Sequence, residues 1–285
     1  MEVILAEKCG FCLGVKNAIM LAKQTLAQNS NVFSLGSIIH NQQVIEELAQ
    51  AGLKTVDSVD EIASGTVLIR SHGATRQQLE RIKEKKLELV DATCVLVKRL
   101  QKISHALNED GYKVVIIGDE RHPEVQAIVG YADNVAVIGA EADLHKLSGH
   151  GKLGVICQTT QSPDHFGRMV GEIIKKGFTE LKIINTLCRE AIRRQQSAIK
   201  LCKQVDIMFV LGGLNSANTK KLAELCKKCN NMTFHLQNWD ELDTSILCGK
   251  ETAGVTAGAS TPHRVIDEFV EKLSAYDTDC GDDVD

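Results

Sequence analysis

The chain has 285 residues, 44% hydrophobic and 25% charged, with a net charge of −4 at neutral pH. This composition is typical of a globular protein and excludes a disordered chain, and there is no apolar run near the roughly 20 residues that a membrane span needs. The negative charge predicts no nucleic-acid partner and, because the N-terminus carries no signal-peptide pattern, we expect a cytoplasmic protein without a membrane partner.

Strand-like runs alternate with amphipathic segments along the chain, which predicts βα units and parallel sheets. The predicted strands are residues 3–5, 32–35, 67–69, 87–90, 114–117, 135–138, 155–157, 182–184, 207–211, 233–236 and 253–255. The helical segments between them include residues 42–49, 76–85, 95–108 and 219–228.

Two kinds of polar loop follow these strands, and each kind occurs three times. The first kind begins with glycine and comprises residues 36–41, 118–124 and 213–218; the second comprises residues 71–74, 158–161 and 257–262. Length alone favours about two domains, but a repeat of this period predicts three α/β units. We expect them at residues 13–95, 96–189 and 190–275, with residues 1–12 packed on the third, and an acidic, disordered tail at residues 276–285.

Three cysteines, Cys12, Cys94 and Cys188, occupy similar places after predicted strands. They lie 82 and 94 residues apart (94 − 12 and 188 − 94), which predicts that distant parts of the chain bring three thiols to one centre. Ten cysteines without a secretory signal favour reduced thiols, metal ligands or a cluster over a disulfide scaffold. Thiolates suit iron–sulfur clusters and zinc, but no close cysteine pair here has a second pair at zinc-like spacing.

The other cysteines have simpler interpretations. For Cys9 with Cys12 the alternative is a redox dithiol, although such motifs normally open a helix in a smaller domain. Cys226 and Cys229 lie on a predicted helix, where small packing residues are favoured. The remaining cysteines are read as core or surface residues, or have no assigned role: Cys157, Cys202, Cys248 and Cys280.

The polar side chains of the repeated loops suit an anionic substrate. Three histidines can donate hydrogen bonds or charge, and four neutral side chains can donate as well: His40, His72, His122, Thr159, Ser216, Asn218 and Ser260. A diphosphate fits, because helices that begin at these loops add amide donors and a favourable dipole. Glu124, the one carboxylate beside a histidine in these loops, is the candidate proton donor.

These motifs together resemble the 4-hydroxy-3-methylbut-2-enyl diphosphate reductase family. The resemblance rests on residues 10–15, 40–41, 71–73, 91–94, 122–125, 158–160, 215–218 and 255–260, which occur in the family's order. It implies a trefoil of three pseudo-equivalent parallel-sheet α/β domains around a central 4Fe-4S cluster (3Fe-4S if oxidatively damaged), held by Cys12, Cys94 and Cys188.

The implied reaction is the reductive dehydroxylation that ends the non-mevalonate isoprenoid pathway, at the open iron of the cluster. It yields isopentenyl and dimethylallyl diphosphates with two electrons and two protons. The resemblance places the hydroxyl group near Thr159 and Glu124 on the proton relay. The diphosphate would lie among His40, His72, His122, Ser216, Asn218 and Ser260. An external ferredoxin or flavodoxin would supply electrons to a monomer.

Several residues depart from the family's pattern. Val95 replaces the usual proline after the central cysteine, and Ala217 replaces a second serine in the third glycine loop. Glu190 and Ala191 replace alanine and threonine after Cys188. Two alternatives therefore stay open: a cluster enzyme of the same fold acting on another small anion, and a non-catalytic iron–sulfur redox sensor that binds a partner through its tail or a basic helix.

Overall fold

The structure is a computed structural model that describes residues 1–276. The predicted disordered tail therefore lies outside the described residues, apart from Tyr276. The chain divides into two compact units. Unit 1 contains residues 1–12, residues 40–44 and the described residues from Arg189 onward, and unit 2 contains residues 13–39 and 45–188.

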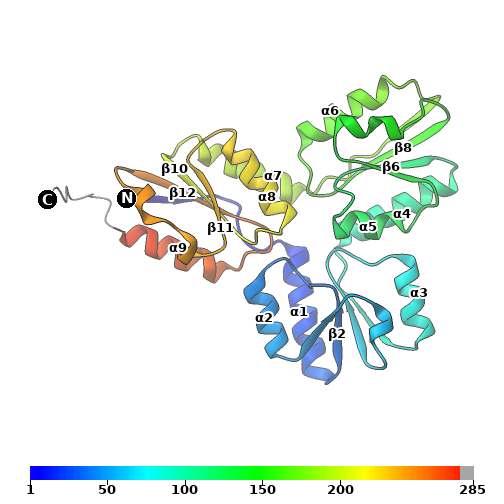
Figure 1. Ribbon diagram of the computed structural model, residues 1–285, viewed down its shortest axis with the longest axis horizontal. Helices are drawn as coiled ribbons and strands as arrows, with labels where there is room; N and C mark the ends of the chain where they lie inside the picture. Colours follow the sequence, from blue (N-terminus) through cyan, green and yellow to red (C-terminus); the bar gives the residue numbers. More distant parts are fainter. Residues whose placement is uncertain (277–285) are drawn as a thin grey trace. The chain divides into compact units, whose positions relative to one another are not determined.

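The strands of the described residues form three parallel sheets of four, two in unit 2 and one in unit 1 (Figure 1). The first sheet contains β2 (Val32–Leu35), β3 (Leu53–Val56), β4 (Thr66–Ile69) and β5 (Glu88–Asp91). The second contains β6 (Lys113–Ile117), β7 (Val135–Ile138), β8 (Lys152–Cys157) and β9 (Glu180–Ile183). The third contains β1 (Glu2–Leu5), β10 (Ile207–Leu211), β11 (Thr233–Leu236) and β12 (Thr252–Ala257).

The predicted fold class, three parallel-sheet α/β units, is confirmed. One strand, β3, is missing from the prediction. It is an edge strand in which only Leu53 is buried, so that its sequence lacks the apolar run by which the central strands are recognised.

All three sheets have the same strand order. From one edge of the sheet to the other, the strands of the first sheet lie in the order β3-β2-β4-β5 and those of the second in the order β7-β6-β8-β9. Read the same way, the third runs β11-β10-β12-β1, so the N-terminal strand occupies the fourth position and pairs with β12. In each sheet the chain reverses its direction of winding between the two central strands, and ligands of open α/β sheets bind at such switch points.

Helices cover both faces of the sheets. The described helices are α1 (Leu13–Gln28), α2 (Gln42–Gln50), α3 (Arg76–Glu84), α4 (Val95–Glu109), α5 (Pro123–Val129), α6 (Pro163–Ile174), α7 (Arg189–Cys202), α8 (Ala217–Lys227) and α9 (His263–Ala275). None of these helices has the length and apolarity needed to cross a bilayer.

Helices pack on both faces of a sheet because successive side chains along a strand point to opposite faces. In β10, Met208 and Val210 pack with residues of α7 and α8, whereas Phe209 packs with Phe269 of α9 on the other face. Figure 1 shows α7 and α8 on one side of this sheet and α9 on the other. Uninterrupted Val/Ile/Leu runs are the expected sequence of strands that are buried on both faces.

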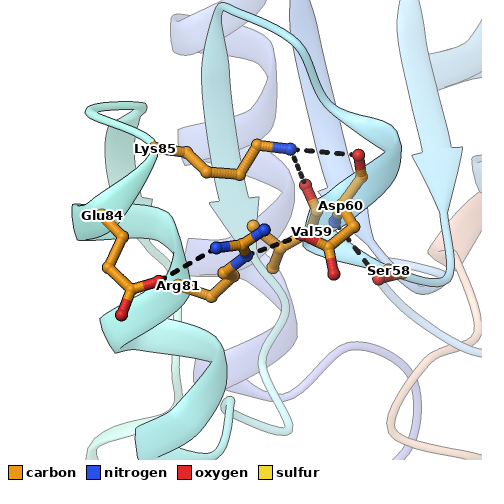
Figure 2. Close-up of polar contacts among 6 residues, drawn as sticks. All are labelled: Ser58, Val59, Asp60, Arg81, Glu84 and Lys85. Carbon is orange, nitrogen blue, oxygen red and sulfur yellow. Dashed lines mark hydrogen bonds and ion pairs between the residues drawn. The ribbon is translucent and has the colours of Figure 1, made fainter.

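A polar network at the surface ties α3 to the short 3-10 helix at Val59–Glu61, as Figure 2 shows. Arg81 donates to a carboxylate oxygen of Asp60 at 2.7 Å, and Lys85 donates to the carbonyl oxygens of Val59 and Asp60 at 3.2 and 3.0 Å. Exposed pairs of this kind contribute little stability each. The packing of α3 therefore depends more on Ile82, which lies in the core.

Candidate active site

The predicted polar residues lie in the loops at the switch point of each sheet. His40 follows β2 and His72 follows β4 in the chain; His122 and Thr159 follow β6 and β8; Ser216 and Ser260 follow β10 and β12. These are the two central strands of each sheet, and their carboxyl ends lie at one edge. The two repeated loop types therefore correspond to the two sides of a switch point.

The three predicted cysteine ligands also occupy equivalent positions in the three sheets. Cys12, Cys94 and Cys188 each follow the fourth strand of a sheet and immediately precede a helix, namely α1, α4 and α7. All three residues are partly buried. The helix dipole favours negative charge at such a position, which suits a thiolate ligand.

A backbone hydrogen bond joins each of these cysteines to the switch-point loop of its own sheet. The amide of Cys94 donates to the carbonyl oxygen of Ser71 at 3.0 Å, and that of Cys188 donates to Thr159 at 2.9 Å. In unit 1, the amide of Cys12 donates to Ala259 at 3.2 Å. The acceptors are, or are next to, predicted substrate-binding residues. The backbone of each cysteine is therefore held next to a predicted substrate-binding loop.

Glu124 lies in the first turn of α5 and is only 3% exposed. One carboxylate oxygen, Oε1, accepts from the backbone N–H of Thr159 at 2.7 Å, and the other, Oε2, accepts from the Thr159 hydroxyl at 2.8 Å. Burial raises the pKa of Glu124, and the two hydrogen bonds from Thr159 lower it less than burial raises it. A carboxyl group in this setting can keep a proton at a pH where exposed glutamate has lost it.

Thr159 connects Glu124 to the third cysteine. Its amide and hydroxyl donate to Glu124, while its carbonyl oxygen accepts from the amide of Cys188. The loop before Cys188 is also fixed, since the hydroxyl of Thr186 donates to the Cys157 carbonyl at 2.6 Å and accepts from the Cys157 amide at 2.8 Å. The predicted proton donor and one predicted cluster ligand are therefore both held at the end of β8.

His122 caps the N-terminus of α5. Its Nδ1 accepts from the backbone N–H of Glu124 at 3.1 Å, so in the neutral ring the proton is on Nε2. The His72 and His122 rings meet edge to face with centroids 5.4 Å apart. Two of the three predicted histidines therefore lie beside each other in unit 2. The capping hydrogen bond leaves the N–H of the neutral His122 ring at Nε2.

In unit 1 the predicted substrate-binding residues surround the start of α8. The hydroxyl of Ser260 donates to the His40 carbonyl at 3.1 Å, and Ser216 caps α8 by accepting from the Thr219 amide at 3.3 Å. The Asn218 side-chain nitrogen Nδ2 is buried and has no hydrogen-bond partner among the described residues. A buried donor without a partner is costly unless a ligand accepts from it.

Sequence reasoning missed Thr219 and misjudged Cys229. The Thr219 hydroxyl is fully buried in unit 1 and has no partner among the described residues. Its position three residues after Ser216 is a capping position, which gave no functional signal. Cys229 was predicted to be a packing residue on a helix, but α8 ends at Lys227 and Cys229 is exposed. Of the cysteines that the sequence left as core or surface residues, Cys157 and Cys202 lie in the core.

The donor set fits an iron–sulfur cluster. Three thiols at helix N-termini, each fixed through its own backbone amide, offer soft ligands on a rigid frame. Each thiol lies beside a loop with hydrogen-bond donors for an anion. Chemically, the residues are suited to reduction of a small anionic substrate with proton transfer from Glu124.

Comparison with known proteins identifies the family. The family described as "LytB protein" matches residues 3–274. The 4-hydroxy-3-methylbut-2-enyl diphosphate reductase of Geobacter sulfurreducens is 45% identical over 278 residues, 97% of this chain and 98% of the relative. The protein of the same name from Geobacter metallireducens is 44% identical, over 98% of this chain and 99% of its own.

Two solved structures are also similar. One is an (E)-4-hydroxy-3-methyl-but-2-enyl diphosphate reductase described as the terminal enzyme of the non-mevalonate pathway, with 36% identity, a TM-score of 0.71, and coverage of 97% of this chain and 100% of the other. The second is the E-1-hydroxy-2-methyl-but-2-enyl-4-diphosphate reductase from Plasmodium falciparum, with 27% identity, a TM-score of 0.92, and coverage of 97% and 89%.

Proposed function

The chain belongs to the LytB protein family, and we propose from this premise that it reduces 4-hydroxy-3-methylbut-2-enyl diphosphate to isopentenyl and dimethylallyl diphosphates. The observation that carries the proposal is the threefold hydrogen bond from a cysteine amide to a switch-point loop, at Cys12, Cys94 and Cys188. A protein that used these cysteines only for packing would have no reason to repeat this arrangement in every sheet.

We propose that Cys12, Cys94 and Cys188 hold a 4Fe-4S cluster. When bound, such a cluster supplies electrons and a Lewis-acidic iron that has no protein ligand. Burial and hydrogen bonding around the cysteine backbones fix the positions of the ligands, since such surroundings tune a metal site. A small redox protein, a ferredoxin or a flavodoxin, would deliver the electrons to a cytoplasmic monomer.

The diphosphate end of the substrate would be held by six residues: His40, His72, His122, Ser216, Asn218 and Ser260. In unit 1, the N-terminus of α8 and the buried Asn218 nitrogen, which has no hydrogen-bond partner among the described residues, would supply donors to the anion, and both favour negative charge. In unit 2, the Nε2–H of His122 supplies a further donor. Neutral donors and a helix dipole bind a diphosphate without competing for the catalytic proton.

Glu124 would supply that proton through Thr159. The backbone N–H of Thr159 fixes Oε1 as an acceptor, so Oε2 is the oxygen that can carry the proton. When Oε2 is protonated it donates to the Thr159 hydroxyl, whose own hydrogen is then directed away from Glu124. Thr159 can therefore pass a proton to the substrate's hydroxyl group, which leaves as water, while the burial of Glu124 keeps bulk water out of the relay.

The test is anaerobic reconstitution with iron and sulfide, followed by reaction with the hydroxylated diphosphate and a strong chemical reductant. We expect both five-carbon diphosphates as products. If the protein binds a cluster but forms neither product, the proposed activity is wrong. The Cys94→Ser variant, prepared in the same way, controls for reduction by free iron and sulfide.

A further inference from the structure

Three cysteines outside the proposed site lie together in unit 1. Cys202 is the last residue of α7, Cys226 lies in the last turn of α8, and Cys229 follows just beyond it. The Cys202 Sγ donates to the carbonyl oxygen of Cys226 at 3.3 Å and lies 3.9 Å from the Thr233 hydroxyl. The two helices thus bring residues that are 24 positions apart in the sequence into contact.

Cys202 and Cys226 form a buried pair. Their side chains are 1% and 0% exposed, in the core between the third sheet and its covering helices. A hydrogen bond with the Cys226 side chain lowers the pKa of Cys202 to about 7, against the opposing effect of burial, and the same hydrogen bond raises the pKa of Cys226. The two thiols therefore share a hydrogen bond inside the core.

Cys229 links this pair to the surface. It is exposed, and its amide donates to the Cys226 carbonyl at 2.9 Å. Its thiol is near enough to influence the pKa of Cys226 electrostatically. Asn230 holds this turn in place, because its side-chain nitrogen donates to the Val205 carbonyl at 2.9 Å. An accessible thiol is thus fixed next to Cys226, whose thiol solvent does not reach.

We propose that Cys229, Cys226 and Cys202 form a thiol–disulfide relay that reduces hydrogen peroxide and stores the oxidation as a buried Cys202–Cys226 disulfide. The Cys229 thiolate attacks one peroxide oxygen, the O–O bond breaks, and a sulfenic acid and hydroxide form. The Cys226 sulfur then attacks the Cys229 sulfur, and the hydroxide that leaves takes the thiol proton and becomes water.

In the last step the Cys202 thiol gives its proton to the first hydroxide, which becomes water, and the resulting Cys202 thiolate attacks the Cys226 sulfur, so that Cys229 leaves as a thiolate. Overall, two thiols lose two electrons and two protons, and one peroxide becomes two waters. The disulfide would link the C-terminal ends of α7 and α8, whose N-terminal ends follow Cys188 and Ser216. A dithiol reductant reverses the reaction.

The test is mass spectrometry of the anaerobically prepared holoprotein after timed exposure to hydrogen peroxide and blocking of the remaining thiols. Trypsin separates the three cysteines into peptides of residues 201–203, 222–227 and 229–250. We expect the first two peptides joined by a disulfide that dithiothreitol removes. In Cys202→Ser, the intermediate should accumulate as a link between the second and third peptides.

Removal of the exposed thiol tests the order of the relay. In Cys229→Ser the buried disulfide should form about tenfold more slowly, because peroxide then has to reach a sulfur inside the core. The Cys157→Ser variant, which removes a buried cysteine in unit 2, should form the disulfide at the rate of the unsubstituted protein. Oxidation of Cys229 to sulfinic acid without any cross-link, or an unchanged rate in Cys229→Ser, would overturn the proposal.

Discussion

Replacement of Glu124 by glutamine is expected to stop turnover while the fold and the cysteine ligands stay intact. Glutamine has the shape of glutamate, and its carbonyl oxygen can accept from the Thr159 backbone N–H as Oε1 does at 2.7 Å. Its amide can donate to the Thr159 hydroxyl, which lies 2.8 Å from Oε2 and is able to accept as well as donate. Both hydrogen bonds therefore survive, but the proton is lost.

The variant should lose activity by about 10²- to 10⁴-fold, the usual contribution of a positioned acid. At neutral pH, however, the variant should be more stable to unfolding than the unsubstituted protein. Burial raises the pKa of Glu124 above its ordinary value of 4.5 despite two hydrogen bonds from Thr159, so the ionised carboxylate is less stable in the fold than in the unfolded chain. The neutral amide avoids that cost.

The sign of the pH dependence follows from the raised pKa. The folded protein holds the proton to a higher pH than the unfolded chain, so the stabilisation is complete below about pH 4.5 and is lost as the pH rises through the folded-state pKa. Glutamine removes this titration. Relative to the unsubstituted protein, Glu124→Gln should therefore be more stable at pH 8 than at pH 4.

The measurements are product formation by the reconstituted protein, its visible cluster absorption, and urea unfolding at both pH values. Glu120→Gln, an exposed residue four positions earlier, is the matched control and should leave all three unchanged. Full activity in Glu124→Gln would remove Glu124 from the proton relay. Loss of the cluster absorption would show instead that the carboxylate has a structural role.

Three further predictions concern other parts of the site. Cys94→Ser should abolish the broad visible absorption of the reconstituted protein, whereas Cys226→Ser should keep it; equal loss in both would indicate zinc or general unfolding. Val95→Pro should stabilise the protein by about 0.4–1 kcal/mol in urea unfolding, because Val95 is 77% exposed at the first position of α4 and the preceding ψ of 138° suits proline; a lower midpoint would contradict this. Asn218→Asp should weaken inhibition by inorganic diphosphate by about tenfold or more, since a negative acceptor replaces a buried donor; unchanged inhibition would remove Asn218 from the diphosphate site.

The sequence alone was enough to predict the central strands and the threefold repeat and to select the candidate residues. Strands buried on both faces require continuous apolar runs, as in Ile207–Leu211, and such runs are visible without a structure. The polar loops after them are equally visible, because a loop at the end of a buried strand has few apolar residues. The edge strand β3 was not predicted, because three of its four residues are not buried and it therefore lacks a continuous apolar run.

Tertiary structure decided how these residues are connected. Thr159 and Glu124 are 35 positions apart, and no local pattern indicates that one binds both carboxylate oxygens of the other. The equivalent bonds from Cys94 to Ser71 and from Cys188 to Thr159 depend on strand order in the same way. The residue types that the chemistry needs are thus local properties of the sequence. Burial, hydrogen-bond partners and the resulting shift in the pKa of Glu124 arise only when separate strands are placed side by side.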